Sequence, residues 1–325
     1  MRVLVTGASG FIGSAIIQEL IANGHEVRGL VRSSEAATAL RRQGVEAIQG
    51  SIEHTAILRQ AGQQMDGVVH TAFFHSFAHA GWRAKLRIMF GGHFKHAPVR
   101  FMKAAVQTDQ HVIETMGNLL SSSGGSLVIA MPTMTMTAGR LALEEHAADV
   151  QSVGGPRAAS EHTALAMAQR GVHASIVRLP PIVYGEGDRG GLLPSLIQSA
   201  RKAGKSAYID DGSNRWASIH RLDAARVFRL ALEKGNGSSR FHAVADEGIA
   251  FRKIAGYIGD SLQLPTESLT TEQGNAHFSW LSSFAATDNP VSADATMKSL
   301  NWRPEQPSLQ DEWAKGYYIQ SSRQR

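Results

Sequence analysis

Cysteine is absent from the 325-residue sequence, and its absence excludes disulfide bonds, thiolate metal sites and cysteine nucleophiles. No run of about 18 apolar residues occurs, and the apolar stretch that follows Arg2 is too short for a signal peptide. We therefore expect a soluble, cytoplasmic protein with no membrane partner. Hydrophobic residues make up 43% and charged residues 19% of the chain, which excludes a disordered protein and supplies a buried core.

Acidic residues are absent from one long segment. Between Gly67 and Thr108 there is no Asp or Glu, whereas Lys, Arg, His and Phe recur over residues 82–103. This pattern is typical of a solvated or oligomer-contact helix face, of a pocket for an acidic ligand or, least of all, of a nucleic-acid interface, and the net charge of +5 does not choose among them. The 14 histidines form no HExxH motif and no cluster with metal-ligand spacing, so we predict no metal site.

The first half of the chain alternates between strand-like and helix-like periodicity. Short apolar runs predict strands at residues 3–5, 26–31, 45–48, 68–72, 126–130 and 174–179, and helical spacing predicts helices at 15–21, 36–42, 156–170 and 221–232. The alternation predicts an α/β fold with a parallel sheet that is covered on both faces. Because glycines and shorter elements follow Pro181, we expect a first domain over residues 1–179 and a smaller region over 180–325, with residues 221–232 returning to the first domain.

The sequence TGASGFIG at residues 6–13 directly follows the first strand and directly precedes the first helix. Glycines at this place permit a tight turn, close approach of the backbone to a pyrophosphate, and close packing of the helix on the strand. The helix N-terminus then offers unpaired N–H groups and a partial positive charge to the phosphates. The motif predicts a dinucleotide site that includes Gly7, Ser9, Gly10, Phe11, Ile12 and Gly13.

The GxxGxxG spacing of this motif resembles the short-chain dehydrogenase/reductase superfamily, and its wording is similar to the extended branch of epimerase- and dehydratase-like proteins. The stretches VRLPPIVYG at residues 177–185 and IHRLDAA at residues 219–225 match later segments of that branch in order, so the resemblance covers nearly the whole chain. It implies a Rossmann-type, doubly wound parallel sheet that binds NAD(P), followed by a smaller C-terminal α+β region that binds the substrate.

The end of the second strand bears on the choice of cofactor. The strand is followed by Arg32, and no acidic residue occurs until Glu35. A dinucleotide fold that takes NAD usually carries an acid here, whereas arginine suits a 2′-phosphate. We therefore expect NADP(H) rather than NAD(H), with a solvated surface arginine as the alternative. The resemblance implies further cofactor contacts at Ser51, Ile52, Ala72, Phe73, Pro180 and Ile182.

The chain departs from the family at its catalytic positions. The family's chemistry uses a Tyr-x-x-x-Lys pair, together with a serine or threonine that binds the carbonyl oxygen. By position, Arg157 stands at the tyrosine and Glu161 at the lysine, and the expected serine falls at or next to Pro132. The chain thus resembles the atypical branch of the superfamily, which keeps the dinucleotide fold and lacks the pair.

Three residues are candidates for the missing catalytic groups, namely Thr133, Arg157 and Tyr184. Arg157 could bind an anionic substrate, polarise a carbonyl oxygen as a fixed cation, or form an ion pair with Glu161 on the same helix face. Tyr184 could supply a proton, or it could pack under a substrate loop.

The resemblance also implies a segment that closes over the substrate, with Arg215 or His220 in contact with it. The alternative is that His220 packs inside the protein and that Asp223 caps the following helix. The sequence leaves both interpretations open.

We predict an NAD(P)-dependent oxidoreductase, preferring NADP(H), that acts on a small carbonyl compound or secondary alcohol without the usual Tyr-x-x-x-Lys pair. The alternatives are a non-catalytic NADP(H)-binding protein that senses redox state, and a sugar epimerase or dehydratase. The expected partner is a small-molecule substrate, nucleic acid is disfavoured, and a homodimer is left open. The identity of the substrate and the stereochemistry of hydride transfer lie outside what the sequence shows.

Overall fold

The computed structural model describes residues 1–74 and 97–320 of the chain. Residue contacts divide the protein into two compact units. Unit 1 consists of residues 1–131, 156–177 and 225–240, and unit 2 consists of residues 132–155, 178–224 and 241–325. Each unit has its own core and is described by itself.

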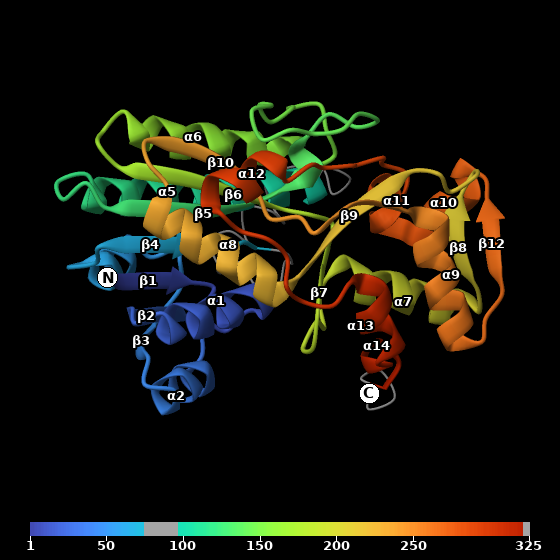
Figure 1. Cartoon of the computed structure of the whole chain (residues 1–325), viewed down its shortest axis with the longest axis horizontal. Helices are drawn as coiled ribbons and strands as arrows, with labels where there is room; N and C mark the ends of the chain where they lie inside the picture. The colour runs from blue at the N-terminus through green and yellow to red at the C-terminus, as the bar shows by residue number, and fades with distance from the viewer. Residues whose placement is uncertain (75–96, 321–325) are drawn as a thin grey trace. The chain divides into compact units, whose positions relative to one another are not determined.

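Unit 1 is built on a seven-stranded sheet with the strand order β10-β6-β5-β4-β1-β2-β3 (Figure 1). Its strands are β1 (Arg2–Thr6), β2 (Glu26–Val31), β3 (Glu46–Gln49), β4 (Gly67–His70), β5 (Ser126–Pro132), β6 (His173–Leu179) and β10 (Ser238–His242). Strands β1 to β5 pair in parallel, for instance with Val3 opposite both Val27 and Gly67. The predicted α/β fold with a doubly wound parallel sheet is confirmed.

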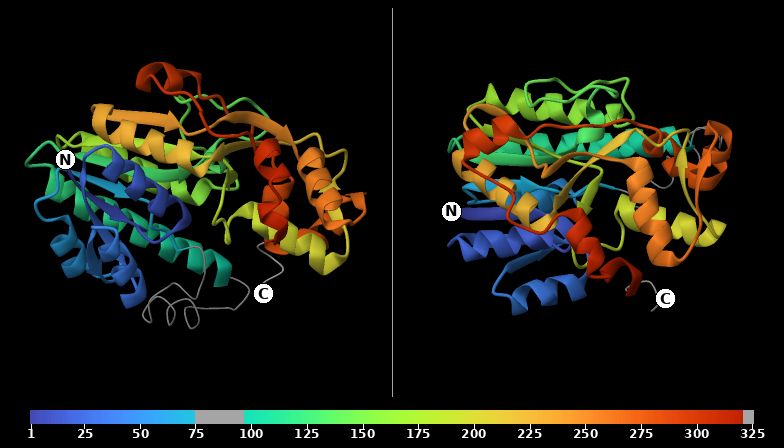
Figure 2. Two further views of the ribbon diagram at one scale, coloured as in Figure 1. Left: turned by 60° about the horizontal axis from the view of Figure 1, so that its bottom comes forward. Right: turned by 45° about the vertical axis from the view of Figure 1, so that its right-hand side comes forward.

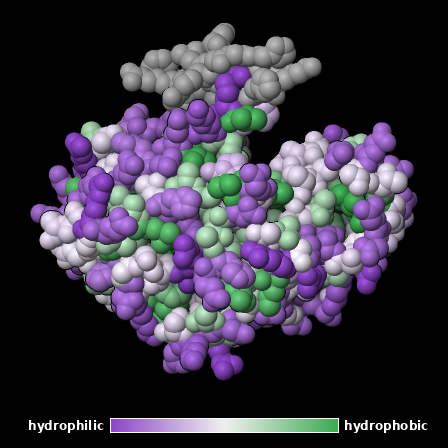
Figure 3. Space-filling model, turned by 90° about the horizontal axis from the view of Figure 1, so that it is seen from above, coloured by the Kyte–Doolittle hydropathy of each residue, from purple (hydrophilic) through white to green (hydrophobic). Residues whose placement is uncertain are grey.

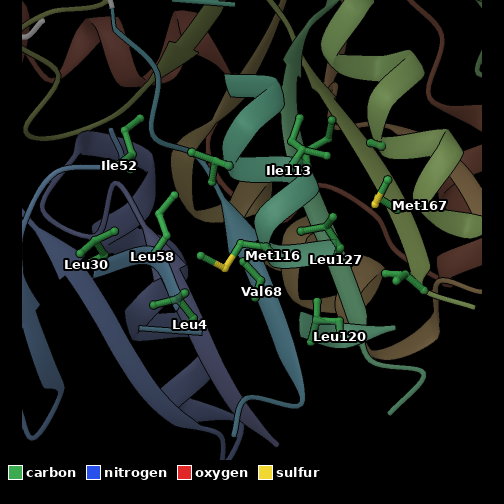
Figure 4. Packing of buried hydrophobic residues seen from close by; sticks show 14 of the residues in the cluster. Leu4, Leu30, Ile52, Leu58, Val68, Ile113, Met116, Leu120, Leu127 and Met167 are labelled. Atoms are coloured by element: carbon green, nitrogen blue, oxygen red, sulfur yellow. The ribbon is translucent and has the colours of Figure 1, made fainter. Parts of the chain in front are cut away.

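Helices lie along both faces of this sheet (Figures 1 and 2). They are α1 (Phe11–Ala22), α2 (Ser34–Arg42), α3 (Thr55–Gly62), α5 (Ala97–Leu120), α6 (Ala158–Ala168) and α8 (Arg221–Lys234), with the 3-10 turn η4 (Gly155–Arg157) before α6. Figure 4 shows the core on one face, where Ile113 and Met116 of α5 lie against strand residues such as Val68. On the other face α8 packs so closely on β4 that a Cβ at Gly67 would lie 2.7 Å from Leu232.

The order of the strands reverses at β1, and this reversal defines the place where a ligand can bind. Strands β2 and β3 lie on one side of β1, and β4, β5, β6 and β10 lie on the other. In open α/β sheets, ligands bind beyond the carboxyl ends of the strands at such a reversal of strand order. The ends of β1 and β4 are at Thr6 and His70, whose backbones are paired in the sheet. The candidate site of unit 1 is therefore expected next to these two residues.

Unit 2 contains two small sheets with helices packed around them. The three-stranded sheet has the order β11-β9-β7, and the two-stranded sheet pairs β12 with β8. The strands are β7 (Ile182–Tyr184), β8 (Ser206–Ile209), β9 (Arg215–His220), β11 (Asp246–Ala250) and β12 (Thr266–Leu269). The helices are α7 (Leu192–Ala203), α9 (Phe251–Leu262), α10 (Thr271–Phe278), α11 (Ser282–Ala285), α12 (Asp294–Leu300), α13 (Leu309–Ala314) and α14 (Tyr317–Gln320), with the 3-10 turns η3 (Thr133–Thr135) and η5 (Ser279–Leu281).

A buried carboxyl joins the loop after β7 to the C-terminal helix of unit 2. Asp188 is only 3% exposed, and it accepts hydrogen bonds from the Gly191 N–H at 3.0 Å and from the Tyr318 hydroxyl at 3.3 Å. The Tyr318 oxygen in turn accepts from the N–H of Gly185 at 3.2 Å. Burial raises the pKa of Asp188 to about 6 because the two donors only partly offset the loss of water around the charge.

Candidate functional site

The glycine-rich loop has the geometry of a phosphate cradle. Gly7 has a φ of +71°, and its carbonyl accepts from the N–H of Gly10 at 2.8 Å, which closes the turn. A Cβ at Gly13 would lie 2.2 Å from the Gly7 oxygen, so only glycine lets α1 start this close to β1. Helix α1 has no side-chain cap and no acid in its first turn, and Ser9 and Gly10 are exposed. The first N–H groups of α1 therefore fit a pyrophosphate.

The region after β2 presents an exposed cation. Arg32 is exposed, and within residues 1–74 and 97–320 its side chain has no hydrogen bond or ion pair. Ser33 is used as the N-cap of α2, where it accepts from the N–H of Ala36 at 3.2 Å. The guanidinium is thus an unpaired cation beside the N-terminus of a helix, which is a favourable place for an anion.

The other expected cofactor contacts of unit 1 differ in their surroundings. Ser51 accepts a hydrogen bond from the Glu53 N–H at 3.3 Å, so its hydroxyl supports the local turn. Ile52 is buried and belongs to the core cluster. Ala72 and Phe73 follow β4 directly and are half-buried, and the N–H of Ala72 lies 3.0 Å from the place of a Cβ at Gly7. The structure thus brings Ala72 and Phe73 beside the glycine-rich loop.

Arg157, at the end of η4, lies close to the carboxyl ends of β4 and β5. Its Nη2 donates to Asp109 Oδ2 at 3.1 Å and to the carbonyl of Ala130 at 2.9 Å. Its guanidinium carbon lies 4.1 Å from the centre of the Phe73 ring, within range of a cation–π contact. Three different elements therefore fix one cation next to the end of β4. Arg157 pairs with Asp109, whereas Glu161 is paired with Arg240 at 2.8 Å, so the ion pair between Arg157 and Glu161 that the sequence left open is not the observed arrangement.

A chain of buried polar groups runs from Arg157 back to β1. His70 Nε2 donates to Asp109 Oδ1 at 3.0 Å, and the Thr6 hydroxyl oxygen lies within hydrogen-bond distance of His70 Nδ1, at 2.6 Å. Asp109 and His70 are each 2% exposed. Although burial by itself raises the pKa of Asp109, the positive charge of Arg157 and the hydrogen bond from His70 outweigh it and hold that pKa well below its usual range. Asp109 is therefore an ionised carboxylate at neutral pH.

His70 and Asp109 were not among the residues predicted from the sequence. Asp109 lies on the buried face of α5, between Val106 and Val112 in a run of apolar positions. An acidic residue at the helical spacing of core positions is a signal of a buried, paired charge, because an unpaired one would be too costly. His70 carries no comparable signal, because a histidine at the end of a strand is usually read as a strand residue.

The hydroxyl candidates of unit 2 already have internal partners. The buried Thr133 hydroxyl donates to the Asn289 amide oxygen at 2.6 Å, and the Asn289 amide nitrogen donates back to the Thr133 carbonyl at 3.1 Å. The Tyr184 hydroxyl donates to the carbonyl of Pro307 at 2.8 Å. Burial, with nearby acids, raises the pKa of Tyr184 above its usual range. The Tyr184 hydroxyl is therefore held as a neutral structural donor.

The expected substrate contacts of unit 2 are also engaged. Arg215 forms a two-bond ion pair with Asp288, from Nε at 3.0 Å and from Nη2 at 2.8 Å. His220 is buried, its Nδ1 accepts from the Leu222 N–H at 3.2 Å, and burial lowers its pKa. Its ring lies edge-on to Tyr184 with 5.5 Å between ring centres. The structure thus brings Tyr184 and His220 together within unit 2.

Two neighbouring residues complete this part of unit 2. Pro180 lies between β6 and β7, and Ile182 begins β7 and belongs to the core of the unit. Asp223 does not cap α8: it lies inside the first turn, and its carboxylate accepts from the N–H groups of Glu305 and Gln306 at 3.0 Å each. The interpretation of Asp223 as a helix cap is therefore wrong, because its acceptors are used to fix a distant loop.

The described residues allow only a partial check of the predictions about the basic stretch, metal sites and membrane spans. Most of the basic stretch at 82–103 lies outside the residues that the structure describes. In the described part of the chain no group of three or more His, Asp or Glu residues could hold a metal ion. The helices of that same part include none with the length and apolar character required to cross a bilayer. On the face drawn in Figure 3, hydrophobic residues are interspersed with hydrophilic ones.

Comparison with known proteins identifies the family. A sequence profile of the NAD dependent epimerase/dehydratase family matches residues 3–90 and 156–244, together more than half of the chain. The chain belongs to this family. It is 40% identical over 320 residues to an uncharacterized protein of Schizosaccharomyces pombe, covering 98% of this chain and 100% of that protein. The resemblance inferred from the glycine-rich loop is therefore confirmed.

Two further comparisons bear on the fold and on the type of reaction. The chain is 26% identical over 281 residues to a 4-hydroxy-2-methyl-3-oxo-4-farnesyl-3,4-dihydroquinoline-1-oxide ketoreductase of Stigmatella aurantiaca, covering 86% of this chain and 77% of that protein. A double mutant of the dTDP-glucose 4,6-dehydratase DesIV from Streptomyces venezuelae, solved with NAD bound, has the same fold with a TM-score of 0.74. That likeness has 20% identity and covers 99% of this chain and 97% of the other. At the level of the family, an NAD(P)-dependent protein of oxidoreductase type is confirmed.

Proposed function

We propose that this protein is an NADP(H)-preferring oxidoreductase that reduces a small carbonyl compound, or oxidises the corresponding secondary alcohol, with Arg157 as the group that binds the carbonyl oxygen. The glycine-rich loop and the N-terminus of α1 would hold the pyrophosphate, and Arg32 the 2′-phosphate. The bound nicotinamide supplies or accepts the hydride. The ketoreductase relative from Stigmatella aurantiaca supports carbonyl chemistry. The assignment of residues 1–179 to cofactor binding and of residues 180–325 mainly to substrate binding remains a prediction.

The observation that carries the proposal is the fixed guanidinium of Arg157 at the carboxyl end of β4. Within the described residues only its Nη2 has hydrogen-bond partners, so Nη1 keeps its donors for a ligand. Donors that are already fixed before the reaction stabilise the negative charge that develops on a carbonyl oxygen without reorganisation. Arginine stays protonated in proteins, so Arg157 stabilises the oxygen and the proton reaches it from water. Thr133 and Tyr184 are weaker candidates for binding the carbonyl oxygen because both hydroxyls already donate hydrogen bonds inside unit 2.

The proposal is tested by NADPH oxidation with a panel of aldehydes and ketones. Arg157→Lys keeps the charge but loses the planar fork, and we expect turnover to fall about 100-fold, the size of an oxyanion-donor loss. The matched control is Arg229→Lys, which alters another paired arginine, bonded to Glu19 and Glu233, and should leave turnover unchanged. Equal turnover by wild type and Arg157→Lys would reject the role of Arg157.

The cofactor preference has a separate test in binding. Because Arg32 would contact a phosphate that only NADPH carries, Arg32→Ala should weaken NADPH binding about 10- to 100-fold and leave NADH binding nearly unchanged. Titration of the intrinsic tryptophan fluorescence with each cofactor measures both affinities. Arg41→Ala, in the last turn of the helix that follows Arg32, serves as the matched surface control. Equal losses of affinity for NADPH and NADH would indicate instead that Arg32 is a solvated surface arginine.

A second candidate function is a non-catalytic NADP(H)-binding protein that reports redox state. The observation in its favour is that Thr133 and Tyr184 are both held in internal hydrogen bonds. Tight NADPH binding without turnover on any carbonyl of the panel would favour it. A sugar epimerase or dehydratase is a weaker candidate, since the DesIV likeness is one of fold and the residue directly after β2 is Arg32 rather than an acid that could bind an NAD ribose.

A further inference from the structure

Among the described residues, the hydrogen bonds of the Arg157 guanidinium are all made by one nitrogen. Nη2 carries both of its hydrogen bonds, to Asp109 and to the Ala130 carbonyl. Nε is buried with no partner, and among the described residues Nη1 has none either. The side chain is 14% exposed, so Nη1 is the nitrogen that remains to donate to a ligand, in surroundings that are mostly shielded from water.

The positive charge of the Arg157 guanidinium is already neutralised by the carboxylate of Asp109. Asp109 is 2% exposed, it lies 3.1 Å from Arg157, and its pKa is held below its usual range. The His70 N–H at 3.0 Å and the Thr6 hydroxyl behind it keep the carboxylate ionised and fixed in position. The pair therefore has a formal charge of zero, although it still presents N–H donors.

A ligand's own charge decides how it responds to such a pair. A carbonyl oxygen is neutral before the reaction and gains from the donors without facing a full charge on Asp109. A carboxylate or phosphate bound to the same donors would approach the Asp109 carboxylate in a weakly screened environment, and the repulsion would cancel most of the attraction from Arg157. Charge balance thus separates two substrate classes that the sequence could not distinguish.

We propose that Asp109 is a specificity-determining residue, which acts through Arg157 to make the site accept uncharged carbonyl compounds and reject substrates that would place a carboxylate or phosphate on Arg157. This inference rests on the proposed function of Arg157 as the carbonyl-binding group. His70 is a positioning residue in the same arrangement, because it holds Asp109 through a buried hydrogen bond.

The test compares ethyl pyruvate with pyruvate, which share the reacting ketone and differ in the charge of the neighbouring group. We expect wild-type kcat/KM with NADPH to favour the ester at least about tenfold, and Asp109→Asn to reduce this ratio about tenfold because the site becomes positive. A merely structural role of Asp109 would lower both rates together and leave the ratio unchanged. Glu19→Gln, which removes the partner of Arg229 elsewhere in unit 1, is the control and should keep the wild-type ratio.

The outcomes are separable from those of the proposed function. A wild-type preference for pyruvate overturns the inference by itself, even if Asp109→Asn does not fold, and so does an unchanged ratio in a folded Asp109→Asn. Turnover of neither ketone rejects the proposed function, and anion binding then decides the inference without catalysis. In that case pyruvate should raise the melting temperature of Asp109→Asn more than that of wild type, and equal shifts would overturn the proposed charge balance.

Discussion

Two buried aspartates, one in each unit, have opposite pKa shifts. Asp109 of unit 1 is 2% exposed and Asp188 of unit 2 is 3% exposed, so both residues are almost fully buried. The pKa of Asp109 is lowered, whereas that of Asp188 is raised to about 6. Asp109 lies beside the guanidinium of Arg157, and the hydrogen bonds of Asp188 come from neutral groups, the Gly191 N–H and the Tyr318 hydroxyl.

The difference shows that burial alone does not determine the charge of an acid. Neutral donors reduce the cost of a buried carboxylate but leave part of it, whereas a full opposite charge within hydrogen-bond distance reverses the sign of the shift. The ionised aspartate is therefore found at the candidate site, where it neutralises the charge of Arg157. The aspartate with the raised pKa is found where the chain joins a loop to its C-terminal helix.

The largest effect is expected when the positive charge beside Asp109 is removed. Arg157→Ala leaves a buried carboxylate without its partner, and we expect a loss of about 3–5 kcal/mol in the free energy of unfolding at pH 7. The loss should shrink as the pH falls, because the unpaired carboxyl has a raised pKa in the folded variant and acid neutralises it. Urea denaturation at several pH values measures both effects.

Two control variants show whether the lost charge is the cause. Arg157→Ala combined with Asp109→Asn should be more stable than Arg157→Ala alone, because the uncompensated charge is gone. Arg229→Ala breaks ion pairs with Glu19 and Glu233 near the surface and should cost about 1 kcal/mol or less. A loss for Arg157→Ala that does not depend on pH would indicate lost packing instead.

The second change removes the unfavourable charge of Asp188. Its folded pKa is above the ordinary value of 3.8, so its protonated form favours folding and stability falls as the pH rises from about 4 to about 6. A shift of about two pKa units corresponds to about 3 kcal/mol. The stability of Asp188→Asn relative to wild type should therefore rise by up to about 3 kcal/mol between pH 4 and pH 7, as followed by denaturant unfolding. A difference that stays constant over this range would contradict the raised pKa.

The smallest expected effect concerns the neutral donor. Tyr318→Phe removes the hydroxyl that donates to Asp188 and accepts from Gly185, and we expect a loss of about 1–2 kcal/mol. The loss should be larger at pH 8 than at pH 5, since a hydroxyl bonds more strongly to a carboxylate than to a carboxylic acid. Tyr317→Phe, which removes an acceptor for the Gly187 N–H, is the control and should show no such pH dependence in thermal melting.

The local periodicities of the chain were sufficient to predict much of unit 1. The apolar run at residues 3–5 predicted a strand, and β1 is buried on both faces because helices cover both sides of the sheet. The glycines of TGASGFIG predicted the turn and the closeness of α1 to β1, because these constraints act within a few residues. Unit 2 gave weaker signals, since its short strands pair with segments far away in the sequence, such as β7 with β9.

At the candidate site the sequence named Arg157 but not the residue that controls it. The spacing along one helix offered Glu161 as one possible partner, and the observed partner, Asp109, is 48 residues away on α5. Thr133 and Tyr184 were candidates by position, yet their hydroxyl partners, Asn289 and Pro307, come from distant segments. A side chain's identity can be read from sequence, but whether its hydrogen bonds are already used cannot.

Local sequence patterns were enough to predict the family, the α/β architecture and the place of the glycine-rich loop, because each follows from residues that are neighbours along the chain. They also predicted that Arg157 stands at the position of the catalytic tyrosine and that Arg32 favours a 2′-phosphate, and both remain predictions. The tertiary structure decided the charge of the site, since it brings Asp109 and His70 to Arg157 from separate elements. Charge depends on which groups lie within a few ångströms of one another, and only folding brings those groups together.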